Sequence, residues 1–96
     1  WITGDCYLLR AAGDSMVDVG IDDGDLVLIE RTEEVFDGQI AAVLTEDGTT
    51  LKRYRIGEKR PYLQAENKSY AEETRFLYPR EIRVQGLARK VIKELK

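Results

Sequence analysis

The sequence predicts a mainly β fold: a small, compact domain of several short and mostly antiparallel strands. Its 96 residues suffice for one hydrophobic core, so we expect a single domain over residues 1–96. Apolar runs of roughly four to six residues alternate with turn signals rich in glycine and aspartate. Almost no segment has the period of an amphipathic helix. Together these observations indicate about six or seven strands and hardly any helix.

Three apolar runs in the first half of the chain are expected to be strands. Residues 6–9 form a compact run, and residues 26–29 are continuously apolar, as in a strand buried on both faces. Residues 40–44 form the third run. The segment Glu46-Asp47-Gly48 follows it, and its Asp-Gly pair is a strong hairpin signal. We therefore expect residues 40–44 to pair with the next strand.

The second half opens with an alternating segment at residues 49–54, which places Thr50 and Lys52 on the same face of a strand. A polar turn is expected after it. Residues 62–65 are expected to form another short strand. The polar residues 67–74 are expected to form a loop.

The C-terminal segment is open to two interpretations. Leu87, Val91 and Leu95 have the i, i+4, i+8 spacing of a helix face. At Gly86, however, the alternation of apolar and polar residues along a strand shifts by one position, which is typical of a β-bulge. We favour a strand over residues 82–92 with a bulge at Gly86.

The composition excludes most enzyme chemistries. The chain has no histidine and a single cysteine, Cys6, so it holds no Ser-His-Asp or Cys-His centre and no His- or Cys-rich metal site. We expect neither a metal nor another cofactor. The formal net charge of -3 argues against a free-standing DNA-binding surface, and no apolar run approaches the roughly 18 residues of a membrane span. A lone cysteine gives no sign of an oxidising compartment, so the expected location is cytoplasmic.

Ser15 and Lys52 are the candidate catalytic residues. Ser15 lies in a turn of small residues that can expose its hydroxyl. Taken alone, Ser15 is more simply explained as a helix cap and Lys52 as a solvated strand residue. In a chain without histidine, however, a serine and a lysine are the natural base-activated nucleophile pair. Paired carboxylates for glycoside hydrolysis stay open as an alternative, because their spacing selects no pair.

The most specific pattern is spread over three segments: Gly13-Asp14-Ser15-Met16, Gly20-Ile21-Asp22-Asp23-Gly24-Asp25-Leu26 and Thr50-Leu51-Lys52-Arg53. This pattern resembles the catalytic domain of the LexA-type self-cleaving repressors, peptidase family S24, which includes phage repressors and UmuD-like mutagenesis proteins. The resemblance runs from about Tyr7 to the C-terminus. It implies the β-clip-type fold of LexA and signal peptidase. It also implies a Ser-Lys dyad, with Ser15 as nucleophile and Lys52 as general base.

The function implied by the resemblance is that of a serine endopeptidase that cleaves its own chain. The domain would be the C-terminal catalytic and dimerisation domain of a LexA-like or phage-type repressor that controls SOS-type DNA-damage genes. Its implied partners are a second copy as homodimer, a RecA-type filament as co-protease, and operator DNA through an N-terminal domain. Its substrate would be its own cleavage loop, with an Ala-Gly bond. Residues 1–96 hold neither that domain nor that loop, so we expect a longer protein.

Two alternatives to a repressor are compatible with the same residues. One is a UmuD-like accessory subunit of a lesion-bypass polymerase. The other is a dimerisation module in which Ser15 and Lys52 have no catalytic role. The residues that precede Trp1 in the gene would separate them, because a helix-turn-helix upstream means a repressor and a short tail means a UmuD-like protein.

Lys52 must be neutral to act as a base. With an ordinary pKa of about 10.4, roughly one lysine in 2,500 is neutral at pH 7, a cost of about 4.6 kcal/mol. Burial is the usual remedy, because desolvation disfavours the charged form. We expect a docked substrate loop to supply this burial. Without it, we expect Lys52 to be more exposed and mostly charged.

The C-terminal strand is the expected dimer surface. Residues 82–92 would otherwise present an open edge of unpaired N–H and C=O groups. Most small homo-oligomers are two-fold dimers. We therefore expect this strand to pair across a two-fold axis, with Val91 in the contact.

Overall fold

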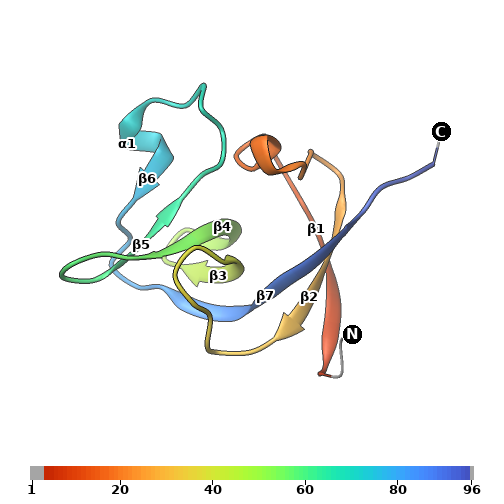
Figure 1. The fold of residues 1–96 in the computed structure, drawn as a ribbon, viewed down its shortest axis with the longest axis horizontal. Helices are drawn as coiled ribbons and strands as arrows, with labels where there is room; N and C mark the ends of the chain where they lie inside the picture. Colours follow the sequence, from red (N-terminus) through yellow and green to blue (C-terminus); the bar gives the residue numbers. More distant parts are fainter. Residues whose placement is uncertain (1–3, 96) are drawn as a thin grey trace.

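The computed structural model describes residues 4–95, and within them seven strands form one antiparallel sheet (Figure 1). The strand order is β1-β2-β7-β3-β4-β5-β6. The elements in chain order are β1 Cys6–Arg10, the 3₁₀ turn η1 Val17–Val19, β2 Leu26–Arg31, β3 Ile40–Thr45, β4 Gly48–Ile56, β5 Pro61–Gln64, the one-turn helix α1 Glu72–Arg75, β6 Phe76–Leu77 and β7 Arg83–Ile92. The predicted mainly β fold is confirmed.

The hairpin between β3 and β4 forms where the Asp-Gly pair predicts it. Thr45 pairs with Gly48, so only Glu46 and Asp47 lie in the turn. Gly48 has a φ of +108°, a conformation that residues with a side chain rarely adopt. The turn chemistry therefore fixes the register of the strand that carries Lys52.

Strand β2 is buried on one face rather than on both. Val27 and Ile29 are fully buried, whereas Leu26 and Leu28 on the other face are partly exposed. The expectation of burial on both faces was wrong, because no further layer of the described chain covers the outer face of β1 and β2. Continuous apolar character in a short strand does not reveal which face is covered.

Strand β7 contains the bulge expected at Gly86. On β3, Ala42 pairs with Gly86 and Val43 pairs with Val84, so Gln85 is the extra residue. A Cβ atom on Gly86 would lie 2.3 Å from Ile29 Cγ2 and 2.6 Å from the Glu30 carbonyl oxygen. Only glycine allows the strands to approach this closely, and the strand interpretation of the C-terminal segment is confirmed.

The position of β7 in the sheet differs from the expected open edge. It lies between β2 and β3, and its first half, residues 83–87, pairs with β3. The pairing with β2 extends to Ile92, but the pairing with β3 ends at Leu87. The prediction was therefore wrong for the first half of β7. Within the described chain, residues 88–92 do have one side without a strand partner.

The sheet carries a hydrophobic cluster on each face. Ala42 points into one cluster, and its neighbours Ala41 and Val43 point into the other, as alternation along a strand requires. The first cluster also contains Met16 and Ile21 from the loop between β1 and β2. This loop is thereby anchored to the sheet, and it is the loop that carries Ser15.

The segment expected to be a loop at residues 67–74 runs into two small elements. Helix α1 covers Glu72–Arg75, and β6 pairs its two residues with Leu63 and Gln64 of β5. Neither element is long enough to show an apolar period in the sequence, which is why neither is predicted. No helix of residues 4–95 is long and apolar enough to cross a membrane.

Candidate active site

Ser15 lies in the turn that joins β1 to η1. The next residue, Met16, is 3 % exposed and packs into the first hydrophobic cluster. This packing fixes the turn against the sheet directly beside Ser15. On the other side, the Gly13 N–H donates to Asp23 Oδ1 at 2.7 Å, and Gly13 has a φ of +82°. The Ser15 side chain is left partly exposed between these two anchors.

The Ser15 hydroxyl does not cap a helix. The N-cap position of η1 is Met16, and this turn has no side-chain cap bond. Ser15 Oγ instead lies 3.2 Å from Lys52 Nζ, across 37 residues of chain. The structure therefore brings together the two residues that the sequence singles out.

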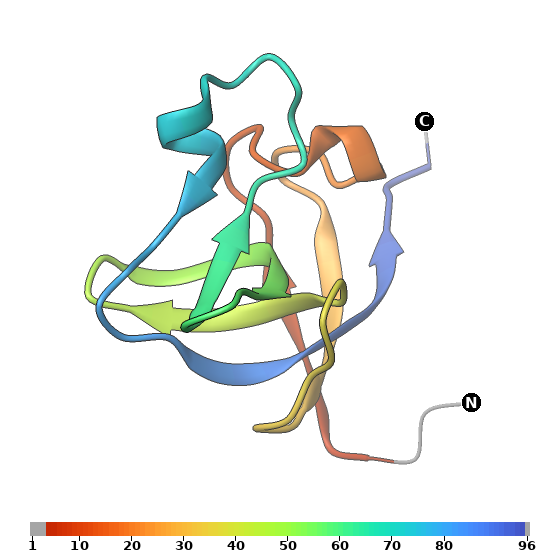
Figure 2. The same ribbon diagram turned by 60° about the vertical axis from the view of Figure 1, so that its left-hand side comes forward.

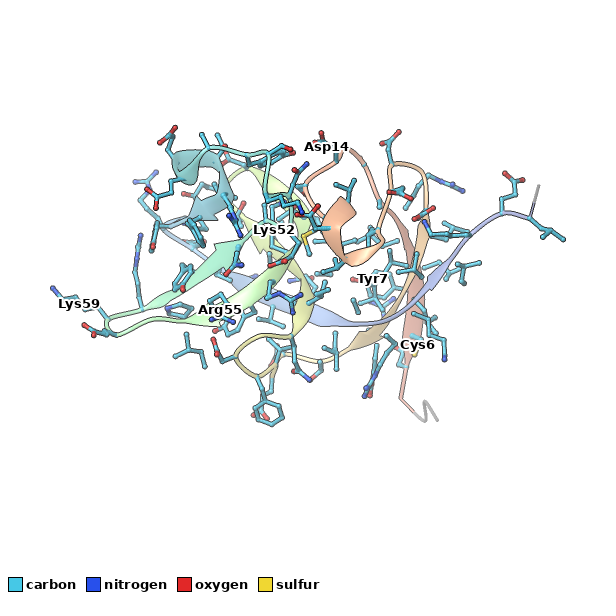
Figure 3. The ribbon with its side chains drawn as sticks, turned by 45° about the horizontal axis from the view of Figure 1, so that its top comes forward. Cys6, Tyr7, Asp14, Lys52, Arg55 and Lys59 are labelled. Atoms are coloured by element: carbon cyan, nitrogen blue, oxygen red, sulfur yellow. The ribbon has the colours of Figure 1, made fainter. Side chains whose placement is uncertain are left out.

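Lys52 projects from β4, directly opposite Ala41 of β3 (Figure 3). Its Nζ also lies 2.6 Å from Thr50 Oγ1, two residues earlier on the same face of the strand. Among residues 4–95 no carboxylate lies within ion-pair distance of Nζ. The polar partners of this amine are thus two neutral hydroxyls.

Lys52 is buried, contrary to the expectation that it would be exposed without a docked loop. It is 8 % exposed, and its cross-strand neighbour Ala41 is fully buried. Burial lowers the pKa of Lys52 from its ordinary value of 10.5, since desolvation disfavours the charged amine. The fold itself therefore supplies part of the burial that the sequence argument assigns to the substrate loop.

Hollows lie on both sides of the Ser15–Lys52 pair. A pocket of about 100 Å³ borders Ser15 and is lined by apolar side chains, among them Leu9, Met16, Ile21 and Leu51. A wider hollow of about 540 Å³ borders Lys52 and is lined in part by Leu63, Leu77 and Tyr78. Both are bordered by Thr49 and Thr50, so this part of β4 lies between the two hollows.

The edge of β4 beside this pair is free. Strand β5 pairs only with Arg53 to Ile56, so within the described chain residues 48–52 have a strand partner on the β3 side alone. An extended peptide can add to such an edge through main-chain hydrogen bonds. The arrangement thus combines a serine, a buried lysine, a small apolar pocket and a docking edge for a peptide.

Two residues that the sequence analysis does not name as site residues border the site. Thr50 is on the face of Lys52, as its spacing predicts, but nothing in the sequence indicates that it contacts the amine. Asn67 comes from the polar segment after β5 and is 6 % exposed, with its side chain on the Ser15 turn. A contact between residues 53 positions apart leaves no signal in a single sequence.

Comparison with known proteins identifies relatives along nearly the whole chain. Residues 1–89 match the family described as Peptidase S24-like. The LexA repressor of Shewanella loihica is 39 % identical over 87 residues, which is 91 % of this chain and 42 % of that protein. The LexA repressor of Desulforamulus reducens is 41 % identical over 92 residues, which is 92 % of this chain and 41 % of that protein.

The chain thus spans about two fifths of the length of these relatives. Its match to the family covers the Ser15 turn, Lys52 and the greater part of β7. On the strength of this coverage and of the identity to the two repressors, the chain belongs to the Peptidase S24-like family.

Proposed function

We propose that this chain is the self-cleaving peptidase domain of a LexA-like transcriptional repressor. The observation that carries the proposal is the 3.2 Å contact between Ser15 Oγ and the Nζ of a lysine that is buried. Such a lysine is a usable base, because burial brings its pKa toward neutral pH. The similarity to LexA repressors supports the same assignment.

The proposed reaction is hydrolysis of a peptide bond through an acyl-enzyme. Neutral Lys52 takes the proton of Ser15 as Ser15 Oγ attacks the scissile carbonyl carbon. Backbone N–H groups of the Ser15 turn hold the oxyanion. The C–N bond then breaks, and protonated Lys52 gives its proton to the leaving amine. Water attacks the Ser15 ester and loses a proton to Lys52, so that the carboxyl product leaves and the serine hydroxyl is restored.

Thr50 has a positioning role in this scheme. A neutral amine has two N–H donors and one lone pair. If one N–H is held by Thr50 Oγ1 at 2.6 Å, the lone pair of Nζ can face the hydroxyl proton of Ser15 at 3.2 Å. The same contact suits the charged amine, which donates to Ser15 Oγ. The pair therefore needs no rearrangement when the proton moves.

The proposed substrate is an extended segment of the same protein upstream of this domain. The free edge of β4 at residues 48–52 would hold its backbone. The pocket of about 100 Å³ beside Ser15 suits a small apolar side chain, in keeping with the Ala-Gly bond that the resemblance implies. A RecA-type filament would favour the docked state of this segment, and two copies of the domain would pair in the repressor.

The test is self-cleavage of the protein that includes its native upstream segment. We expect two fragments to appear faster as pH rises, because alkali supplies neutral Lys52. Ser15→Ala and Lys52→Ala should each stop the reaction while leaving the fold intact by circular dichroism. Mass spectrometry of the fragments identifies the bond. Alkaline cleavage that persists in either variant would assign the chemistry to other residues.

A further inference from the structure

A second loop is hydrogen-bonded to the turn that carries Ser15. This loop, residues 66–70, follows β5 and lies against the turn in both ribbon views (Figures 1 and 2). The Asp18 N–H donates to the Glu66 carbonyl at 2.8 Å, and the Lys68 N–H donates to Asp18 Oδ2 at 2.7 Å. We call residues 66–70 the clasp loop. Two further contacts reach Asp14, the residue directly before Ser15.

The two contacts to Asp14 differ in what they hold. Asn67 Nδ2 donates to the backbone carbonyl of Asp14 at 2.9 Å, whereas the Tyr70 hydroxyl donates to the Asp14 carboxylate. Asn67 is 6 % exposed, and its Oδ1 accepts the Ser69 N–H at 2.9 Å. Both ends of the buried amide are therefore satisfied, and this fixes which end faces Asp14.

The Asp14 carbonyl and the Ser15 N–H belong to one peptide unit. That unit is planar and trans, so its C=O and N–H point in opposite directions. By holding the carbonyl, Asn67 fixes the direction of the Ser15 N–H on the opposite side. Within residues 4–95 the Ser15 N–H donates to no protein acceptor. It is thus an oriented donor beside the nucleophile with its hydrogen bond unused.

We propose that Asn67 is a positioning residue that aims the Ser15 N–H at the oxyanion formed during cleavage. The inference rests on the proposed function, because it needs Ser15 to be the nucleophile. A backbone donor stabilises the oxyanion only if it points at that oxygen before the charge develops. A free peptide unit in a turn could rotate away, and the buried side chain of Asn67 prevents this.

The test is the pH profile of self-cleavage in the protein with its native upstream segment, comparing Asn67→Asp with the unsubstituted protein. The substitution keeps the acceptor for the Ser69 N–H and replaces the donor to Asp14 with an oxygen that repels the carbonyl. Loss of one oxyanion donor costs about 10²–10³ in rate, and a misdirected donor keeps part of its effect. We therefore expect the alkaline plateau to fall roughly 10- to 100-fold.

The pH at which the rate of self-cleavage is half-maximal distinguishes positioning from a merely structural role. A general disturbance of the site would change this pH, whereas loss of an oriented donor lowers the rate alone. Asn67 makes no hydrogen bond to Lys52, so the pH at half-maximal rate should stay unchanged in Asn67→Ala, which removes the same donor without adding a charge near the lysine. Tyr70→Phe is the matched control. It removes a bond from the same loop to the same residue but leaves the peptide unit held, so its plateau should change by less than about twofold.

Each result bears on the inference separately from the proposed function. An unchanged plateau in folded Asn67→Asp, a shifted midpoint in Asn67→Ala, or an equal loss in Tyr70→Phe would each overturn the role of Asn67. If Asn67→Asp does not fold, Asn67→Ala gives the same test without an added charge. No cleavage at any pH in the unsubstituted protein would instead reject the proposed function, and the role of Asn67 with it.

Discussion

The two halves of strand β4 differ in their strand partners and in the groups that surround their cations. Arg53 to Ile56 pair with β5, and the cations of this half have acidic partners: Arg53 Nε lies 3.1 Å from Glu66, and Arg55 Nε lies 3.8 Å from Asp37. Residues 48–52 have no partner on that side within the described chain. Their one cation, Lys52, is buried with hydroxyl partners only.

The two halves show what decides the behaviour of a cation on a strand. A neighbouring carboxylate favours the charged form, whereas burial without one favours the neutral form. The half that pairs with β5 therefore holds structural charges. The half with a free edge combines a lysine that can lose its proton with a place where a peptide can pair. Strand β7 shows a related contrast, since Gly86 and Leu87 pair with both β2 and β3, whereas residues 88–92 have only β2 as a strand partner within the described chain.

The strongest test of the difference between the two halves of β4 is to replace one cation in each half and compare the rates of self-cleavage. Lys52→Met should lower the rate of self-cleavage by about 10³-fold or more, because a general base alone contributes about 10²–10⁴ and the serine also loses its activation. Arg55→Met, three residues further on, should leave the rate within about threefold. Both rates are measured at the alkaline plateau in the protein with its upstream segment. Comparable losses would mean that the strand matters as a whole.

The second prediction concerns Gly86, where β7 pairs with both β2 and β3. Gly86→Ala places a methyl group within 2.3 Å of Ile29 Cγ2 and 2.6 Å of a backbone oxygen, neither of which can move freely in the centre of the sheet. We expect a loss of about 3 kcal/mol in the free energy of unfolding, at the upper end of ordinary overpacking. Urea unfolding followed by circular dichroism measures it. A loss below about 0.5 kcal/mol would show that the strands separate easily at this crossing.

The third prediction concerns the free half of β7. If residues 88–92 pair with a second copy, Val91→Glu should raise the dissociation constant of the dimer at least tenfold, because burying an unpaired charge costs more than about 1.4 kcal/mol. Val91 is 37 % exposed in the single chain. Leu95→Glu is the control, since Leu95 is 97 % exposed beyond the end of the strand. Sedimentation velocity gives both constants, and a monomeric unsubstituted protein would place the interface elsewhere.

The features that the sequence predicts correctly have local signals. The β3–β4 hairpin follows from Asp47-Gly48, and the bulge in β7 follows from the loss of alternation at Gly86. The hairpin and the bulge can each be judged within a window of a few residues. The choice of Ser15 and Lys52 as catalytic residues stays a prediction, and it depends on a motif spread over three segments and on the absence of histidine from the chain.

The features that the sequence does not predict depend on which distant strands meet. The burial of Lys52 depends on what packs against its face of β4, and the central position of β7 depends on pairing with both β2 and β3. The bond from Asn67 to Asp14 joins two loops that are far apart in the chain. Alternation gives the face of a side chain but not what covers that face.

The smallest expected effect is on stability, and its sign separates Lys52 from Arg55 on β4. The pKa of Lys52 is lowered in the folded chain by burial, from an ordinary 10.5 that the unfolded chain keeps. Below the folded pKa the amine is charged in both states, and the folded chain bears the full cost of desolvation. As pH rises between the folded pKa and 10.5, the unfolded state binds more protons than the folded one, so the free energy of unfolding rises.

Lys52→Met removes this buried charge and keeps the length of the side chain. The variant should therefore be more stable than the unsubstituted chain at pH 7, and its advantage should shrink as the pH approaches 10.5. Other groups titrate in both proteins and cancel in the difference. Urea midpoints at pH 7 and pH 10 measure it, and Arg55→Met should show no such trend, because an arginine is charged at both pH values. A variant that is equally destabilised at both pH values would mean that the hydroxyl contacts of Lys52 outweigh the cost of burying it.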